Sequence, residues 1–253
     1  MKPGVWAAAS EGTAKWSDPA IVKALGIWKQ LFSDGIMEPG ALGVQQYPDA
    51  DNDFLSGKYA MVMMGTWYMQ YSTVAGMTDA ISAAGVADPK PFPILPVAFP
   101  DVAGSGHSNA LFGDSDYGLA VNSKSKNAAA ATTFAVWLGT STAGQQEIAN
   151  ALNDIPALNG VKPQWNSIKL VSQSAQQSAL QNLTKQTSTV KESRLALISA
   201  NLGTAILVAT NTVAAGDATP AAAAATLQAI RGRIGREVQG LGRRLARSLD
   251  LFE

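Results

Sequence analysis

The sequence predicts a mixed α/β fold that becomes mainly helical toward its C-terminal end. An amphipathic stripe over residues 21–32 is typical of a helix, and a continuous apolar run over residues 59–64 is typical of a strand buried on both faces. Most of the chain after residue 167 carries helical patterns. With 253 residues, 47% of them hydrophobic, the chain can bury the core of one large domain or of two small ones.

The first long helix has a clear start and end. The Asp18 carboxylate can accept hydrogen bonds from the free amides of the first turn, and Pro19 suits the first helical position. Gly35 ends the helix. Six apolar residues share one face and predict a core contact: Ile21, Val22, Leu25, Trp28, Leu31 and Phe32.

The middle of the chain alternates short elements with loops. A helical turn over residues 51–56 precedes the strand at 59–64, Gly65 ends that strand, and a short helix begins at residue 66. Five prolines between residues 88 and 100 remove backbone donors and predict an extended connector or edge strand. Residues 101–116 are rich in glycine, serine and aspartate, and predict a loop.

The remainder reads as one strand followed by helices. A short strand is expected at residues 117–121, and an alanine-rich helix with Phe134, Trp137 and Leu138 on its apolar side comes next. Further helices are predicted over residues 141–152, 167–183, 191–214 and from Pro220 onward.

Composition excludes several kinds of function. The absence of cysteine rules out disulfides, thiolate nucleophiles and cysteine-ligated metals, and the single histidine, His107, rules out a two-histidine metal site. Nineteen basic and nineteen acidic residues balance, which argues against a nucleic-acid partner. No cofactor, no metal site and no catalytic residue are expected. The first ten residues lack the apolar stretch of an export signal.

Two acidic groups could carry chemistry. Asp49, Asp51 and Asp53 alternate as in a calcium-binding loop, but the glycine and the bidentate carboxylate of that pattern are missing, so we expect a solvated, helix-capping turn. Asp114 and Asp116 could act as the acid and base of a glycosidase if the fold held them at the required separation. Such a pair in a glycine-rich loop is more typical of a turn.

Basic residues change from lysine to arginine near the end of the chain. Arg194 is the only arginine before residue 231, whereas six follow between residues 231 and 247. Three interpretations stay open: an amphipathic helical end, a basic arm for nucleic acid or anionic lipid, and a change of reading frame near Ile230. The first interpretation predicts buried packing by Ile234, Val238, Leu241 and Leu245.

Aromatic residues follow the predicted strand at 59–64. Trp67 lies after Gly65 at the position where open α/β sheets place their ligands, and its indole could stack on the apolar face of a sugar. Tyr117, next to Asp116, could supply a second aromatic and polar pair. The alternative is that Trp67 packs a helix against the sheet.

Residues 54–67 read FLSGKYAMVMMGTW and resemble the signature segment of bacterial extracellular solute-binding proteins of the carbohydrate ABC importer class, the maltose-binding-protein-like group. Further similar segments follow in the order of that family and together cover about residues 12 to 230: PFPILP at 91–96, YGLAVNSKSKNAAAATTFAVWL at 117–138, GQQ at 144–146, IPA at 155–157 and AGDATP at 215–220.

The resemblance implies a periplasmic-binding-protein-like (type II) fold and a non-catalytic monomer that captures a sugar or oligosaccharide outside the cytoplasmic membrane. It implies delivery to the permease subunits of an ABC importer, with peripheral membrane association through the permease or through a lipid anchor that this chain lacks. It also implies the ligand-binding residues: Trp67 as the stacking aromatic, Gly65 as the turn that sets it, and, as weaker candidates, Asp116, Tyr117, His107 and Asp114.

The resemblance also implies an organisation into lobes. Residues 1–118 would belong to the C-terminal lobe, 119–155 to a remnant of the N-terminal lobe, 156–230 to a return into the C-terminal lobe, and 231–253 to an arginine-rich tail. Relatives carry an export signal and most of the first lobe ahead of the segments matched here. We therefore expect weak or absent sugar binding by this chain alone, because a ligand held between two lobes needs contacts from both.

Two other functions stay open at this stage. A glycoside-active enzyme would use Asp114 and Asp116 in one pocket. An interaction protein would act through the arginine-rich end and would bind DNA or anionic vesicles in a salt-dependent way.

Overall fold

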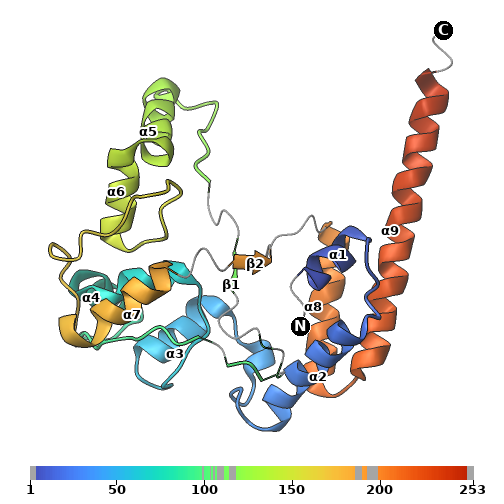
Figure 1. Cartoon of the computed structure of the whole chain (residues 1–253), viewed down its shortest axis with the longest axis horizontal. Coiled ribbons are helices and arrows are strands. Elements are labelled where there is room, and N and C mark those ends of the chain that lie inside the picture. Colours follow the sequence, from blue (N-terminus) through green and yellow to red (C-terminus); the bar gives the residue numbers. More distant parts are fainter. Residues whose placement is uncertain are drawn as a thin grey trace. The chain divides into compact units, whose positions relative to one another are not determined.

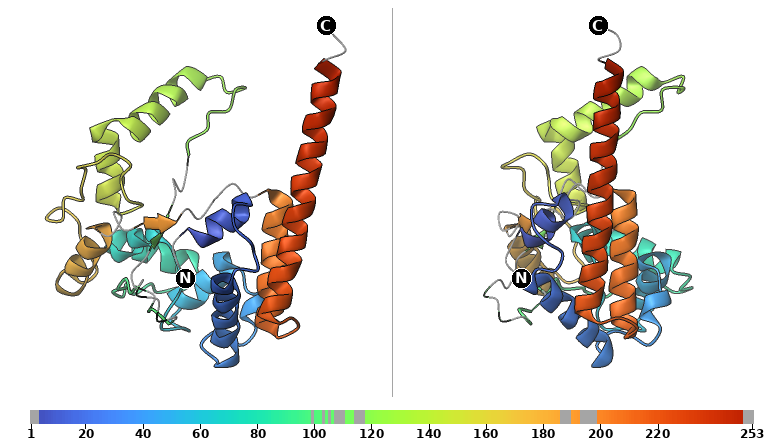
Figure 2. Two further views of the ribbon diagram at one scale, coloured as in Figure 1. Left: turned by 45° about the vertical axis from the view of Figure 1, so that its right-hand side comes forward. Right: turned by 90° about the vertical axis from the view of Figure 1, so that its right-hand side faces the viewer.

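Helices make up most of the described chain (Figures 1 and 2). The computed structural model describes residues 4–98, 100–102, 104, 106, 111–113, 118–185, 190–192 and 199–249, without side chains at 111–112, 190–192 and 237–249. Among the described helices, none combines the length and the hydropathy needed to cross a membrane.

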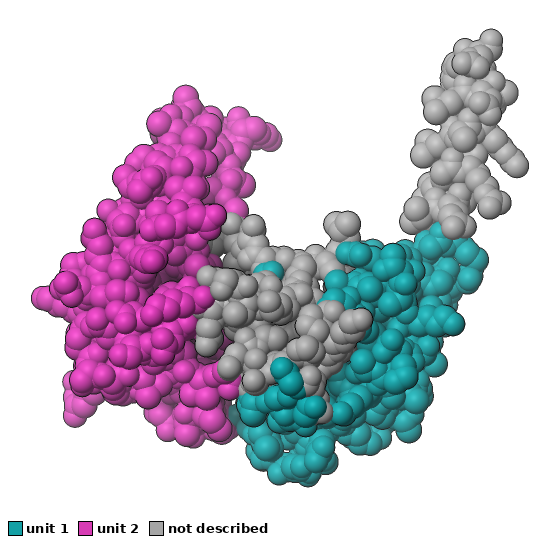
Figure 3. Space-filling view, viewed as in Figure 1, with its two compact units in different colours: residues 1–43, 99–114, 190–253 teal, residues 44–98, 115–189 magenta. Residues whose placement is uncertain are grey.

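The chain divides into two compact units (Figure 3). Unit 1 comprises Met1–Gly43, Phe99–Asp114 and Val190–Glu253, and unit 2 comprises Val44–Ala98 and Ser115–Thr189. These units are defined by contacts within this chain, whereas the expected lobe boundaries refer to the family fold. The lobe boundaries therefore stay a prediction.

Unit 1 is built around three helices that lie side by side: α2 (Pro19–Ser33), α8 (Ala200–Ala215) and α9 (Pro220–Leu249) (Figures 1 and 2). It also holds α1 (Val5–Glu11), the short η1 (Ala41–Gly43) and the strands β1 and β2. The core draws on every long helix of the unit and on the segment before α2: Ala9, Trp16, Ile21, Leu25, Leu202, Ala209, Val213, Ala223, Ala224 and Leu227.

Helix α2 forms as its sequence predicts. The Asp18 carboxylate accepts a hydrogen bond from the Ala20 amide at 2.8 Å, and Pro19 occupies the first turn. Ile21 and Leu25 are buried in the core of unit 1. The indole of Trp28 donates a hydrogen bond to the Thr210 carbonyl at 3.2 Å, which ties α2 to α8.

Helix α9 crosses the expected boundary between residues 230 and 231 without a break. The Arg231 guanidinium donates hydrogen bonds to the carbonyls of Ser10 (3.0 Å) and Glu11 at the C-terminal end of α1. Ile234 packs against the core of unit 1. These contacts favour the helical-end interpretation as far as Ile234; the side chains of Val238, Leu241 and Leu245 lie outside the described part.

Unit 2 contains two core clusters that share the short helix η3 (Thr66–Ser72). Tyr68 belongs to a cluster with residues from α3 (Asp51–Leu55) and α4 (Val74–Ala83), which we call cluster A: Phe54, Leu55, Tyr68, Met77, Ala80 and Ile81. Met69 belongs to cluster B with Leu152, Ile168, Leu170 and Leu180. The remaining elements are η2 (Gln46–Ala50), α5 (Ala128–Thr140), α6 (Thr142–Ala151) and α7 (Gln173–Lys185).

The predicted strand at residues 59–64 is wrong. This segment is neither helix nor strand, and it forms no ladder with a described strand. Met61 and Met63 are 82% and 61% exposed, whereas Val62 and Met64 pack against cluster A. The apolar run therefore packs against cluster A through one face only. A strand buried on both faces needs a hydrogen-bonded neighbouring strand, and the described chain places none beside residues 59–64.

The described strands lie elsewhere. β1 (Leu111–Phe112) and β2 (Val190–Glu192) pair in parallel within unit 1. Residues 190–192 were expected near the start of a helix, but α8 begins only at Ala200, where Ser199 caps it. The strand expected at residues 117–121 is not formed over its described part, 118–121. The described chain is helix-rich with one small sheet, so the α/β class stays a prediction.

Helix α5 presents its apolar side chains to solvent. None of its residues is buried, and Phe134, Val136 and Trp137 are 56%, 56% and 39% exposed. The Phe134 and Trp137 rings contact each other at a centroid distance of 5.9 Å. Apolar spacing correctly marked the helix, but did not show which side chains this chain covers.

Candidate functional site

The candidate site in unit 2 begins with the turn from Gly65 to Trp67 at the start of η3. A Cβ atom built on Gly65 would lie 2.1 Å from Cζ3 of Trp67. No side chain fits at that distance, so glycine is required by the indole that lies against its backbone. The Trp67 indole therefore packs directly against the Gly65 backbone. The role of both residues toward a ligand stays a prediction.

The Trp67 ring contacts the core on one part and reaches the surface with its nitrogen. It is half-buried and packs against cluster A. At its nitrogen, Nε1 donates a hydrogen bond of 2.9 Å to the hydroxyl oxygen of Tyr47 at the surface of the unit. The two interpretations of Trp67, packing and ligand contact, are thus compatible in one side chain.

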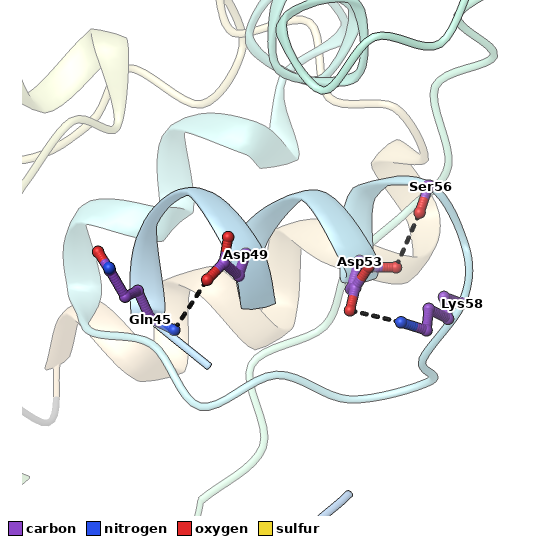
Figure 4. Close-up of polar contacts among 5 residues, drawn as sticks. All are labelled: Gln45, Asp49, Asp53, Ser56 and Lys58. Atoms are coloured by element: carbon purple, nitrogen blue, oxygen red, sulfur yellow. Dashed lines mark hydrogen bonds and ion pairs between the residues drawn. The ribbon is translucent and has the colours of Figure 1, made fainter. Parts of the chain in front are cut away.

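Tyr47 reaches Trp67 from a segment 20 residues earlier in the chain. It has extended backbone angles, precedes Pro48 through a cis peptide bond, and is 42% exposed. Local polar contacts hold the helical segment that follows (Figure 4). Asp49 accepts from the Gln45 amide at 3.1 Å, and Asp53 pairs with the Lys58 ammonium at 2.7 Å.

The three alternating aspartates bind separate partners. Asp49 and Asp53 make the local contacts of Figure 4, whereas Asp51 is buried and accepts a hydrogen bond of 2.8 Å from the Tyr68 hydroxyl. The expectation of a solvated turn is therefore wrong for Asp51, because Tyr68 and cluster A cover it. Within the described residues, no three histidine, cysteine, aspartate or glutamate side chains converge as a metal site requires.

Burial raises the pKa of the ionisable groups around Trp67. Desolvation raises the pKa of Asp51, and the hydrogen bond from Tyr68 opposes part of that increase. Desolvation is also the largest cause of the raised pKa of Tyr68. The hydrogen bond to Asp51 and the charge of that carboxylate raise it further. The pKa of Tyr47 is raised by desolvation, with an opposing contribution from the Trp67 hydrogen bond. The tyrosine hydroxyls are therefore protonated at neutral pH.

A second polar contact holds the same turn through Thr66. The Thr66 hydroxyl donates to Oδ1 of Asp154 at 3.0 Å, and that oxygen also accepts from the Ile155 amide at 2.7 Å. Asp154 follows α6 and directly precedes the IPA segment at residues 155–157. The turn that carries Trp67 is thus held by Gly65, by Tyr47 and by Asp154.

The structure places two of the six predicted site residues, Gly65 and Trp67, together. The other four candidates lie outside the described residues: His107, Asp114, Asp116 and Tyr117. Sequence reasoning missed Tyr47 and Asp154. Asp154 could have been found beside the IPA segment, whereas no local pattern marks Tyr47 as a neighbour of Trp67.

This arrangement suits a neutral, hydroxyl-rich ligand. A half-buried indole supplies an apolar stacking surface, and the Tyr47 hydroxyl beside it can form hydrogen bonds.

Comparison with known proteins defines the class. Residues 2–145, more than half of the chain, match the family model described as bacterial extracellular solute-binding protein, and the chain belongs to this family. This match confirms the family expected from residues 54–67. Membership in this family implies a location outside the cytoplasm.

A solved structure described as a chitin oligosaccharide binding protein has a similar fold. It matches with a TM-score of 0.60 and 18% identity, over 91% of this chain and 53% of that chain. The match supports the expected periplasmic-binding-protein-like fold, and this chain spans about half the length of that protein. A comparison with curated protein sequences finds no match.

Proposed function

We propose that this chain belongs to the substrate-binding component of an ABC importer and contributes to the capture of a sugar or oligosaccharide without catalysing a reaction. The observation that carries the proposal is the Trp67 indole, which Gly65 and Tyr47 hold half-exposed at the surface of unit 2. Family membership supports solute capture, and the name of the structural neighbour supports an oligosaccharide as the ligand.

The chemistry of the surroundings supports a neutral ligand. A raised pKa keeps the Tyr47 hydroxyl protonated, so it presents a hydrogen-bond donor and no charge. Asp154 accepts hydrogen bonds from the Thr66 hydroxyl and the Ile155 amide, and so anchors the turn that carries Trp67. Sugars combine apolar ring faces with hydroxyl groups and match both features.

The proposal includes several roles that the resemblance implies. Permease subunits would be the partners, and the protein would act as a monomer that reaches the membrane through the permease or a lipid anchor. Asp116, Tyr117, His107 and Asp114 would contribute further ligand contacts. Because this chain spans about half of its structural neighbour, we expect binding by the chain alone to be weak, with a dissociation constant on the order of millimolar.

Sugar titration followed by NMR tests the proposal. The chain is labelled with ¹⁵N at its indole groups and titrated with chitotriose, maltotriose and cellotriose. At least one sugar should shift the Trp67 indole resonance, and Trp67→Ala should weaken binding by roughly fivefold or more, as loss of a stacking contact predicts. Trp137→Ala, which removes an exposed indole from α5, is the matched control and should leave binding unchanged. Equal binding by Trp67→Ala and the unmodified chain would show that Trp67 only packs the core.

A further inference from the structure

We propose that Tyr47 is a second ligand-binding residue, whose hydroxyl oxygen accepts the Trp67 indole N–H while its hydroxyl hydrogen donates to an oxygen of the ligand. The inference rests on the proposed function of Trp67. It adds a residue that neither the sequence motifs nor the comparisons assign.

Hydrogen-bond chemistry determines the direction of the Tyr47–Trp67 contact. An indole N–H can only donate, so the Tyr47 oxygen must be the acceptor across the 2.9 Å separation. A tyrosine hydroxyl carries one hydrogen of its own, and among the described residues no acceptor for that hydrogen is found. Because Tyr47 is 42% exposed, the hydrogen is available to solvent or to a ligand.

The position of Tyr47 is fixed before any ligand arrives. Tyr47 lies at the start of η2. The segment around it is closed by the Asp49 carboxylate, which accepts a hydrogen bond from the backbone amide of Gln45. Its partner Trp67 is confined by the Gly65 backbone and by cluster A. A donor held beside a stacking surface in this way loses little conformational freedom on binding.

Protonation of Tyr47 supports the same role. Desolvation and the nearby Asp51 charge raise the pKa of Tyr47, which keeps the hydroxyl in its donor form across the neutral range.

The arrangement has a consequence for specificity. A ligand stacked on Trp67 must present an oxygen acceptor beside the ring to satisfy the Tyr47 hydroxyl. A sugar hydroxyl and the carbonyl of an N-acetyl group both meet this requirement. A sugar that lacks the oxygen would exclude water from the hydroxyl without replacing its hydrogen bond, and should bind less tightly.

The first part of the test needs no ligand. Tyr47→Phe removes the acceptor of the Trp67 indole N–H and keeps the aromatic ring. In the ¹⁵N-labelled chain, the indole proton of Trp67 should move upfield and exchange faster with water in Tyr47→Phe. Tyr71→Phe changes a neighbouring half-buried tyrosine of the same unit and is the matched control, for which no change at Trp67 is expected. An unchanged Trp67 signal in Tyr47→Phe would overturn the positioning role.

The second part adds chitotriose and maltotriose. Tyr47→Phe should raise the dissociation constant of the sugar that binds by roughly three- to tenfold, as expected for one hydrogen bond. The urea midpoint of unfolding should fall only slightly, because the lost indole hydrogen bond lies at the surface of the unit. A purely structural tyrosine would change the midpoint and not the affinity.

The outcomes separate the two proposals. Equal sugar affinity of Tyr47→Phe and the unmodified chain would overturn the ligand role of Tyr47 and leave the sugar-binding function standing. If neither sugar shifts Trp67 in the unmodified chain, the ligand role of Tyr47 falls together with the proposed function, and the ligand-free comparison still decides whether Tyr47 orients the indole.

Discussion

A methyl group at position 65 should displace the Trp67 indole. In Gly65→Ala, the new Cβ would lie 2.1, 2.4 and 2.5 Å from three carbons of the indole, whereas carbon atoms in contact are normally about 3.5–4.0 Å apart. The ring must therefore move by roughly 1.4–1.9 Å, the difference between those contact distances and the shortest of the three. A movement of that size would break the 2.9 Å hydrogen bond to Tyr47.

Unfolding and NMR measurements check this expectation. Forced repacking of this kind costs about 1–3 kcal/mol, so Gly65→Ala should lower the urea midpoint of unfolding. The Trp67 indole resonance should shift, and any sugar-induced change at that resonance should be lost. Gly139→Ala is the matched control, because its methyl group would meet open space within helix α5. A Gly65→Ala chain with an unchanged midpoint and an unchanged Trp67 signal would refute the packing argument.

Three further changes test separate parts of the fold. Arg231→Gln should destabilise unit 1 by about 1–3 kcal/mol, because it removes charge-assisted hydrogen bonds at the end of α1. Arg233 is exposed, so Arg233→Gln should change the free energy of unfolding in urea by less than about 0.5 kcal/mol. Burial raises the pKa of Asp51, so the folded chain holds that proton more tightly than the unfolded chain, and this residue's contribution to stability falls as pH rises from about 4 toward neutrality. The stability of Asp51→Asn relative to the unmodified chain should therefore increase over that range, and a constant difference in thermal midpoint would contradict this reasoning. Met77→Ala should lower the free energy of unfolding by about 2–5 kcal/mol because Met77 is fully buried. Phe134→Ser, on the exposed side of α5, should lower it little. Equal losses of stability in urea unfolding would show that α5 is covered in solution.

Local sequence predicted the features that neighbouring residues determine. The start of α2 follows from the Asp18 cap and Pro19, and the buried positions Ile21 and Leu25 follow from helical periodicity. The association of Gly65 with Trp67 is also local, because the two residues belong to one turn. The ordered segments were sufficient to identify the family.

Contacts between distant segments depended on the tertiary structure. Residues 59–64 have the composition of a strand, but a strand needs a partner elsewhere in the chain, and here the segment packs one face on cluster A instead. Apolar periodicity made α5 recognisable without showing whether anything in this chain covers it.

Local sequence was therefore sufficient for the family segments, for the cap and buried face of α2, and for the adjacency of Gly65 and Trp67, because each of these features depends on residues close in the chain. The tertiary structure alone brought the Tyr47 hydroxyl to the Trp67 indole across 20 positions, and the Arg231 guanidinium to the Ser10 carbonyl across 221. Such pairs form only when packing of the helices places both partners within hydrogen-bonding distance, and no local pattern encodes that distance.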